Sequence, residues 1–126
     1  MHEKKYSIYK ENGIIYCLYE EGTIMDLDLL REAIEARIEA AEGKPCPIFI
    51  DSKGVKYYTL EARKYGVSER ALKDANAYGI LVTSPILRTI LNWSLKFYPV
   101  KGAPSRIFTS RTKALEWLKQ FVTKGQ

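Results

Sequence analysis

The clearest structural signal in this chain lies in residues 47–63, which read PIFIDSKGVKYYTLEAR. A short apolar run ends at Asp51, a Ser-Lys-Gly turn follows it, and Thr59 is a good residue to cap a helix. A continuous apolar run between a proline and a turn is typical of a strand buried on both faces, as in parallel sheets that helices cover. This segment therefore predicts an α/β fold.

Strand and helix patterns alternate along the rest of the chain. An N-terminal hairpin of strands 5–10 and 14–20 is expected around Asn12 and Gly13, followed by an amphipathic helix over 27–41. The remaining expected elements are short helices at 60–65 and 69–74, strands at 77–83 and 106–109, and helices at 86–97 and 111–122. The order ββαβαβαβα predicts one domain over residues 1–126, with a mixed, mostly parallel central sheet of about five strands and helices packed on it. The hairpin places an antiparallel strand at an edge.

Composition and charge restrict the class of protein. The 126 residues are 46% hydrophobic and 28% charged, as in soluble globular domains. No apolar run approaches the roughly 18 residues of a membrane span, and the N-terminus lacks the apolar segment of a secretory signal, so a cytoplasmic location is expected. Residues 1–52 carry a net charge of −5 and residues 53–126 one of +10. The basic half could face an acidic partner, nucleic acid or phosphate, or it could be a solvated surface.

Histidine and cysteine are too sparse for the common catalytic and metal sites. His2 is the single histidine and is terminal, which disfavours nucleophile–histidine catalysis and histidine-based metal sites. Cys17 and Cys46 are far apart and are expected to be buried, unreactive thiols. No phosphate-binding or dinucleotide motif is present. We therefore expect no catalytic residue, metal or cofactor, and predict that the chain is not an enzyme.

The central segment and the element order resemble the STAS domain, the fold of bacterial anti-sigma factor antagonists and of the cytoplasmic part of sulfate transporters. Residues 48–51 match the family's strand and its terminal Asp, Gly54-Val55 matches the pair that follows, and residues 105–118 are similar to the last strand and helix. The resemblance implies a regulatory module that binds a protein partner and catalyses no reaction.

The chain departs from the family at the phosphorylation motif. Where the family has Asp-Ser-Ser/Thr-Gly, this chain has Thr59-Leu60-Glu61-Ala62, which puts Glu61 at the position of the phosphorylated residue. Phosphorylation adds about −1.5 to −2 charges, whereas a glutamate is permanently charged and no kinase can switch it. The pattern is similar to divergent stand-alone bacterial STAS-like proteins. A kinship of that group with lipid-binding Sec14-type domains implies an alternative role as a carrier or sensor of a small ligand, such as a lipid or nucleotide.

The candidate partner- or ligand-binding residues follow the central strand and begin the next helix: Asp51, Ser52, Thr59, Glu61, Arg63 and Lys64. Asp51 ends a central strand, where open α/β sheets bind ligands. Structural roles are open for the same side chains, namely turn contacts for Asp51 and Ser52 and a helix cap for Thr59. Arg63 and Lys64, with Arg70 and Lys73 nearby, could hold a phosphate-bearing ligand or an acidic protein surface, or could be solvated.

Two aromatic residues are a second candidate site. Trp93 and Phe97 lie at i and i+4 of the helix expected at 86–97, whose residues Ile86, Ile90 and Leu91 are expected to face inward. The aromatic pair could form an apolar interface, including one for a homodimer, or it could pack in the core. The aromatic residues do not interleave with basic ones, so nucleic acid ranks below a protein partner and below a small apolar or phosphate-bearing ligand.

Overall fold

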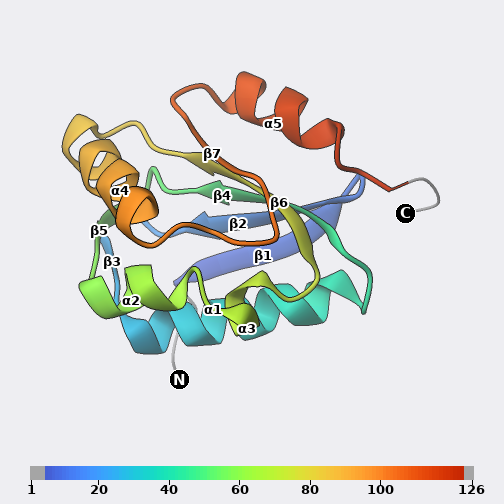
Figure 1. Cartoon of the computed structure of the whole chain (residues 1–126), viewed down its shortest axis with the longest axis horizontal. Helices are drawn as coiled ribbons and strands as arrows, with labels where there is room; N and C mark the ends of the chain where they lie inside the picture. Colours follow the sequence, from blue (N-terminus) through green and yellow to red (C-terminus); the bar gives the residue numbers. More distant parts are fainter. Residues whose placement is uncertain (1–4, 124–126) are drawn as a thin grey trace.

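Residues 5–123, which the computed structural model describes, contain a five-stranded sheet with helices on both faces (Figure 1). His2 lies outside the described residues. The strands are β1 (Tyr6–Glu11), β2 (Ile14–Tyr19), β4 (Cys46–Asp51), β6 (Ala75–Leu81) and β7 (Ser105–Phe108), in the order β1-β2-β4-β6-β7. β1 pairs antiparallel with β2, and the other neighbours pair in parallel. The predicted mixed, mostly parallel sheet with an antiparallel edge strand is confirmed.

The middle strand, β4, is buried on both of its faces. Ile48 and Phe49 are 1% and 0% exposed and point to opposite faces, because successive side chains alternate along a strand. Phe49 packs in a cluster with Leu118, while Ile48 packs in another cluster with Tyr78. The apolar run after Pro47 therefore forms the doubly covered strand that its pattern predicts.

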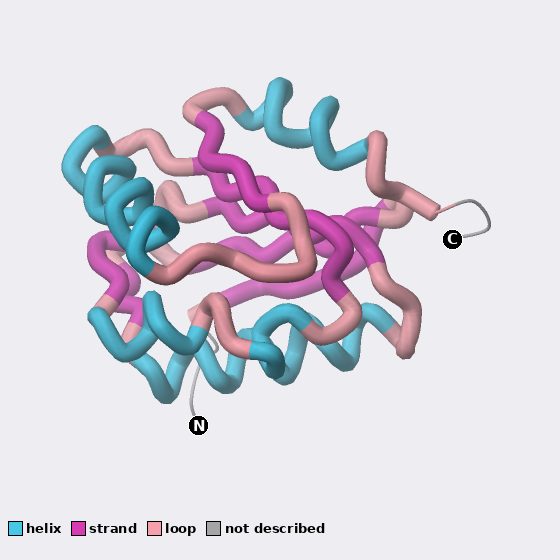
Figure 2. The backbone as a smooth tube through the Cα atoms, in the orientation of Figure 1, coloured by secondary structure: helices cyan, strands magenta, loops and turns pink. Residues whose placement is uncertain are grey.

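The helices divide between the two faces of the sheet. They are α1 (Leu27–Ala41), α2 (Leu60–Tyr65), α3 (Glu69–Leu72), α4 (Pro85–Phe97) and α5 (Arg111–Lys119). Figure 2 shows the strands as a layer between α5 on one side and α1, α2 and α3 on the other, with α4 at one end. Within residues 5–123, none of the helices combines the length and the apolar character that crossing a bilayer requires.

Helix starts are set locally by side chains that accept a backbone hydrogen bond. The N-cap residues are Asp26, Thr59, Ser68, Ser84 and Ser110, and each accepts from the N–H three residues further on. Capping satisfies donors that the first helical turn leaves unpaired, which is why these residue types mark the helix starts. The cap expected from the sequence at Thr59 is confirmed.

A second, small sheet has no counterpart in the sequence prediction. β3 (Thr23–Met25) pairs in parallel with β5 (Val55–Tyr58), the segment between the central strand and α2. The pairing buries Met25, Val55 and Tyr58 in one apolar cluster with residues of α2 and α4. Strands of three and four residues show too little alternation to be recognised, because their stability comes from pairing with a distant segment.

Candidate functional site

Asp51 is held by contacts within the protein. Its Oδ1 accepts a hydrogen bond of 3.0 Å from the backbone N–H of Lys53, the turn contact that the sequence suggested. Its Oδ2 lies 3.6 Å from Nη1 of Arg111, the first residue of α5. The Arg111 guanidinium also lies over the ring of Phe49, 5.1 Å from its centroid. Asp51 thus joins the end of β4 to the start of α5.

Ser52 is a core residue, which corrects its expected position on a binding surface. It is 2% exposed, and its Oγ lies 2.7 Å from the hydroxyl oxygen of Tyr58. Burial raises the pKa of Tyr58 to about 12, so this pair is neutral at physiological pH. A side chain enclosed in this way cannot contact a partner without local unfolding. Thr59 caps α2 by accepting from the N–H of Ala62 at 3.2 Å.

The charged residues of α2 point in different directions. Glu61 and Lys64 are exposed, and the Lys64 Nζ lies 5.6 Å from the centroid of the Tyr98 ring. Arg63 is half-buried and turned toward α4. Its Nε donates to the Tyr58 carbonyl at 3.2 Å, and its Nη1 donates to Ser94 Oγ at 2.7 Å. Arg63 therefore connects α2 to α4.

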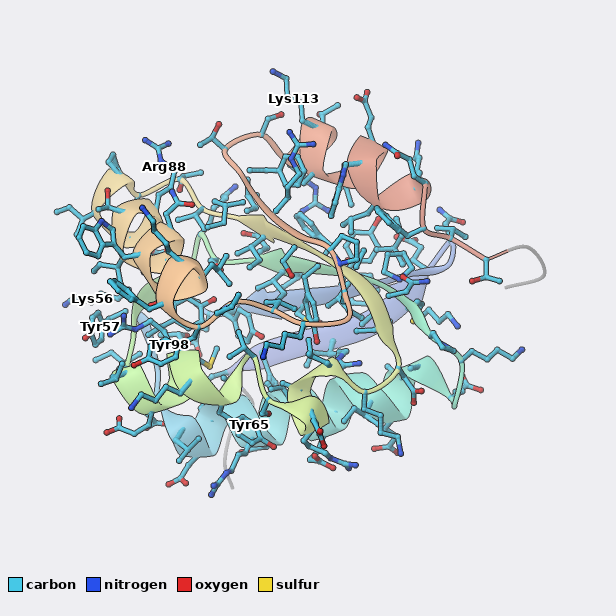
Figure 3. All side chains as sticks on the ribbon, viewed as in Figure 1. Lys56, Tyr57, Tyr65, Arg88, Tyr98 and Lys113 are labelled. Carbon is cyan, nitrogen blue, oxygen red and sulfur yellow. The ribbon has the colours of Figure 1, made fainter. Side chains whose placement is uncertain are left out.

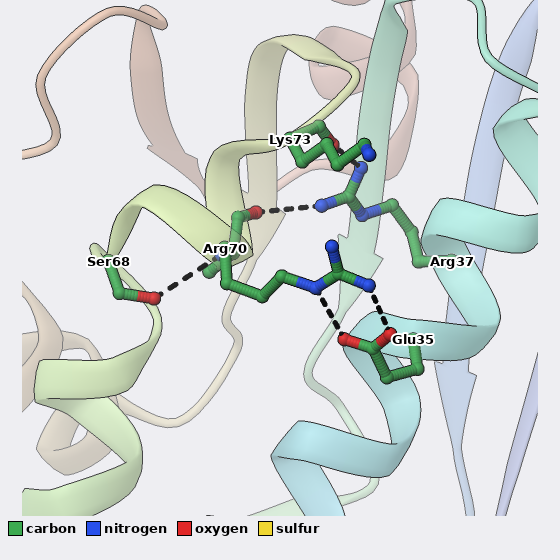
Figure 4. A network of polar contacts seen from close by, with 6 residues as sticks. Glu35, Arg37, Ser68, Arg70 and Lys73 are labelled. Carbon is green, nitrogen blue, oxygen red and sulfur yellow. Dashed lines mark hydrogen bonds and ion pairs between the residues drawn. The ribbon is translucent and has the colours of Figure 1, made fainter.

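Arg70, one of the four basic residues that the sequence groups near α2, is paired with a carboxylate of α1. Arg70 turns away from α2 and pairs with Glu35 of α1, with its Nε 2.8 Å from Glu35 Oε2 (Figure 4). This hydrogen bond lowers the pKa of the Glu35 carboxyl. Arg70 consequently neutralises an acidic helix, and it does not join Arg63 and Lys64 in a common anion site.

Arg37 is a buried residue whose position the sequence analysis missed. It is 2% exposed and donates through Nη1 to the Lys73 carbonyl and through Nη2, at 2.7 Å, to the Ala71 carbonyl (Figure 4). The sequence did contain a signal for this burial. Arg37 follows Leu30 and Ile34 and precedes Ala41 at three- and four-residue spacing, which places it on the apolar stripe of α1. A charged residue type on that stripe is easily read as exposed.

The two cysteines are buried as expected. Cys17 is 3% exposed and Cys46 is 0% exposed, and both are free thiols. Burial raises the pKa of Cys17 to about 12 and also raises the pKa of Cys46, so neither is a reactive thiolate at neutral pH. Across the described part of the chain, no three His, Cys, Asp or Glu side chains are grouped so that they could hold a metal ion.

An apolar cavity of about 110 Å³ lies between α2, α4 and the sheet. Among the described residues that line it, Arg63 is the one charged side chain and none carries a carboxylate. The apolar part of the wall is formed by Leu30, Ile50, Ile80, Leu91, Leu95 and Val100, among others. A smaller cavity of about 60 Å³ shares Leu30, Ile50 and Tyr78 with it and has Arg37 in its wall. The sequence did not suggest this hollow, because it arises from the packing of segments that are distant along the chain.

The outer side of α4 is exposed and apolar. Trp93 and Phe97 are 61% and 65% exposed, with ring centroids 5.7 Å apart, and Ile86, expected to face inward, is 76% exposed. Tyr57 and Leu60 lie next to this side, since each lines a surface hollow together with Trp93. Figure 3 shows Tyr57 and Tyr98 beside α4, together with the basic residues Lys56 and Arg88.

Three candidate residues from the two predicted sites therefore lie together. Arg63 lines one surface hollow with Trp93 and another with Trp93 and Phe97. Asp51 belongs to a different neighbourhood, at the start of α5, and Ser52 is inside the protein. The structure thus joins the charged end of α2 to the aromatic side of α4 and separates both from the tip of β4.

Comparison with known proteins agrees with this architecture. The fold is similar to the crystal structure of an uncharacterized protein from the DUF3478 family with a SpoIIAA-like fold, from Shewanella loihica PV-4. The two share 17% sequence identity over 90% of this chain and 91% of that chain, with a TM-score of 0.58. No curated protein matches the sequence. The family model described as "Domain of unknown function (DUF7793)" matches residues 8–122. The chain belongs to the DUF7793 family, and its fold is SpoIIAA-like, that is, STAS-like.

Proposed function

We propose that this chain is a non-enzymatic, cytoplasmic regulatory module that binds an acidic protein partner. The proposed docking surface, here called the α4 face, consists of Tyr57, Leu60, Ile86, Ile90, Trp93 and Phe97. The observation that carries the proposal is the exposure of Trp93 and Phe97, 61% and 65%, on a flank of α4 that its buried residues Leu87, Leu91 and Ser94 do not occupy. Soluble domains rarely expose a contiguous apolar patch of this kind unless it binds something.

The spacing of the α4 face favours a helix or another elongated apolar segment as the contacting element. Ile86, Ile90, Trp93 and Phe97 are separated by four, three and four residues, which aligns them on one side of the helix. The other side of α4 is occupied by Leu87 and Leu91, which pack in the core. The helix thus has two apolar sides, and the protein itself covers one of them.

Charge around the α4 face favours an acidic partner over a second copy of the chain. Residues 53–64 and 84–98 contain a single carboxylate, Glu61, and six cations: Lys53, Lys56, Arg63, Lys64, Arg88 and Lys96. Two copies joined through this face would bring like charges together, which costs binding energy. A partner with an apolar segment flanked by Asp and Glu would be complementary to both the apolar and the basic residues.

Site-specific photocrosslinking tests the docking surface. A photoreactive amino acid at position 93 should crosslink one acidic protein in cells, and the same probe at exposed Tyr9 on β1 should not. With that partner purified, Trp93→Ala should raise the Kd at least about tenfold, as for an interface hot spot, and Tyr9→Ala should leave it unchanged. Lys64→Glu should slow association most at low salt, because rim charges act mainly on the association rate.

Two results would overturn this proposal. The first is a concentration-dependent dimer, abolished by Trp93→Ala in sedimentation experiments, which would make a second copy the occupant of the α4 face. The second is a blue shift of the Trp93 fluorescence with anionic vesicles in the absence of any crosslinked protein, which would make the face a membrane-binding surface.

The apolar cavity supports a second candidate function, the binding of a small ligand. Its lining is almost entirely apolar and includes Arg63. Its volume of about 110 Å³ disfavours a nucleotide or a whole lipid and is comparable with the roughly 150 Å³ engineered cavity that accepts benzene. In a thermal-shift screen, small apolar compounds should raise the melting temperature, whereas nucleotides should not.

A further inference from the structure

We propose that the cavity between α2 and α4 binds a small apolar carboxylate, whose charged group pairs with Arg63. This inference deepens the small-ligand candidate and rests on it. Three observations support it. The wall of the cavity is apolar, most hydroxyl groups of the lining are already hydrogen-bonded within the protein, and Arg63 is held in place by two hydrogen bonds.

The apolar wall defines the body of the ligand. Leu30, Ile80 and Leu91 contribute side chains from α1, the sheet and α4, so hydrocarbon surrounds the space on several sides. An engineered cavity of about 150 Å³ lined by Leu, Ile and Phe binds benzene, and this cavity, whose wall is apolar apart from Arg63 and a few hydroxyl-bearing side chains, measures about 110 Å³. Its occupant should therefore have an apolar part no larger than about one six-carbon ring.

Most hydroxyl groups of the lining already have partners within the protein. The Tyr58 hydroxyl is bonded to Ser52, and the Tyr78 hydroxyl donates to the Ala71 carbonyl. Ser94 accepts from Arg63. A ligand that needed several hydrogen bonds from these groups would have to break contacts that stabilise the fold and leave buried polar groups unpaired.

Arg63 differs from these groups because its charge has no counterion among residues 5–123. Nε and Nη1 are bonded to Tyr58 and Ser94, which fix the plane of the guanidinium before any ligand arrives. In the described part of the chain, Nη2 has no hydrogen bond, and no carboxylate lies within ion-pair distance of Arg63. A half-buried, preorganised guanidinium forms stronger hydrogen bonds to a carboxylate than to a neutral oxygen.

Arg37, in the wall of the smaller cavity, is not an equivalent anchor. Both of its terminal nitrogens already donate to carbonyls of the α3 segment, at Ala71 and Lys73. A carboxylate there would have to compete with these bonds. The charged end of the ligand is therefore assigned to Arg63, which lies at the boundary between the cavity and the surface hollows of the α4 face.

The matched probes are benzoate, benzyl alcohol and benzylamine, which share one ring and differ in charge. Titrations followed by ¹H–¹⁵N NMR should show benzoate binding to the wild type at least about tenfold more tightly than benzyl alcohol, and benzylamine binding more weakly than either. Arg63→Gln should lower the benzoate affinity to that of benzyl alcohol and leave the alcohol affinity unchanged. Lys64→Gln, which removes the adjacent charge outside the lining, should preserve the preference.

The outcomes separate this inference from the proposal on which it rests. Equal affinities for benzoate and benzyl alcohol, or a preference that survives Arg63→Gln, would overturn the assignment of Arg63 but keep the cavity as a ligand site. Absence of all binding by the wild type would overturn both. Leu95→Phe should fill the cavity and abolish every interaction, which confirms where the probes bind. If Arg63→Gln does not fold, Arg63→Lys keeps the charge and should keep part of the preference.

Discussion

Arg37 joins α1 to the end of α3 through two backbone carbonyls. A guanidinium cannot lose its charge at physiological pH, so a 2% exposed arginine depends on those acceptors for its stability inside the protein. The Lys73 carbonyl takes its side-chain hydrogen bond from Arg37, whereas the Ala71 carbonyl, at the end of the four-residue α3, also accepts from the Tyr78 hydroxyl. This pairing fixes the position of α3, beside the cavities.

Replacing Arg37 should therefore destabilise the protein strongly. Arg37→Leu removes the charge, leaves the Lys73 carbonyl without its side-chain donor and leaves the Ala71 carbonyl with the Tyr78 hydroxyl alone. We expect it to lower the free energy of unfolding by about 2 kcal/mol. Urea denaturation measures the change. Arg70→Leu is the matched control, because its ion pair with Glu35 is exposed and should be worth little. Equal effects of the two substitutions would contradict the structural role of Arg37.

Helices and strands could be predicted from the sequence wherever they are stabilised by residues of the same segment. Thr59 caps α2, and the apolar run at 48–50 forms β4, because hydrogen bonding and burial there follow from neighbouring residues. β3 and β5 were not predicted, since each is stabilised by the other across about 30 residues of chain. The prediction that Ile86 faces inward was wrong for the same reason, because the packing of α4 against distant segments decides which of its two apolar sides is covered.

Of the candidate site, the residue types were predictable and their grouping was not. Arg63, Trp93 and Phe97 were identified by charge and by helical spacing, yet their proximity depends on how α2 packs against α4. Ser52 was misplaced for a similar reason. Its partner, Tyr58, belongs to a strand that the sequence pattern does not predict.

The turn between β4 and β5 passes close to the backbone at the end of β2. A Cβ on Gly54 would lie 2.3 Å from the Tyr19 carbonyl oxygen and 2.8 Å from that of Glu20. Backbone atoms cannot move aside as a flexible side chain can, so the small sheet would have to shift.

Gly54→Ala should therefore lower the free energy of unfolding by about 2 kcal/mol, as for overpacking in a core. Gly66→Ala is the comparison, because the nearest atom to its added Cβ is 3.5 Å away, and it should change stability by less than about 1 kcal/mol. Urea denaturation midpoints of the two variants, measured side by side, show whether Gly54→Ala destabilises the protein more than Gly66→Ala does. A neutral Gly54→Ala would show that the two turns are not in contact in solution.

Considered as a whole, the protein buries several weak acids on one face of its sheet. Burial raises the pKa of Cys17, Tyr58 and Tyr78 to about 12 in each case, from ordinary values of 9.0 for the thiol and 10.0 for the phenols. Tyr19 is shifted upward for the same reason. These groups stay protonated in the folded protein at a pH where the unfolded chain has already lost its protons.

The protein should accordingly lose stability in alkali. The contribution of these groups is complete below about pH 9 and disappears as the pH rises toward 12, because the unfolded chain releases protons first. Urea midpoints should therefore fall steadily from pH 9 to pH 11. Cys17→Ala should flatten the first part of that decline, between pH 9 and pH 10, since the thiol begins to titrate one unit before the phenols. A constant midpoint from pH 8 to pH 11 would mean that water reaches these side chains, and hence that the helices over this face of the sheet are open in solution.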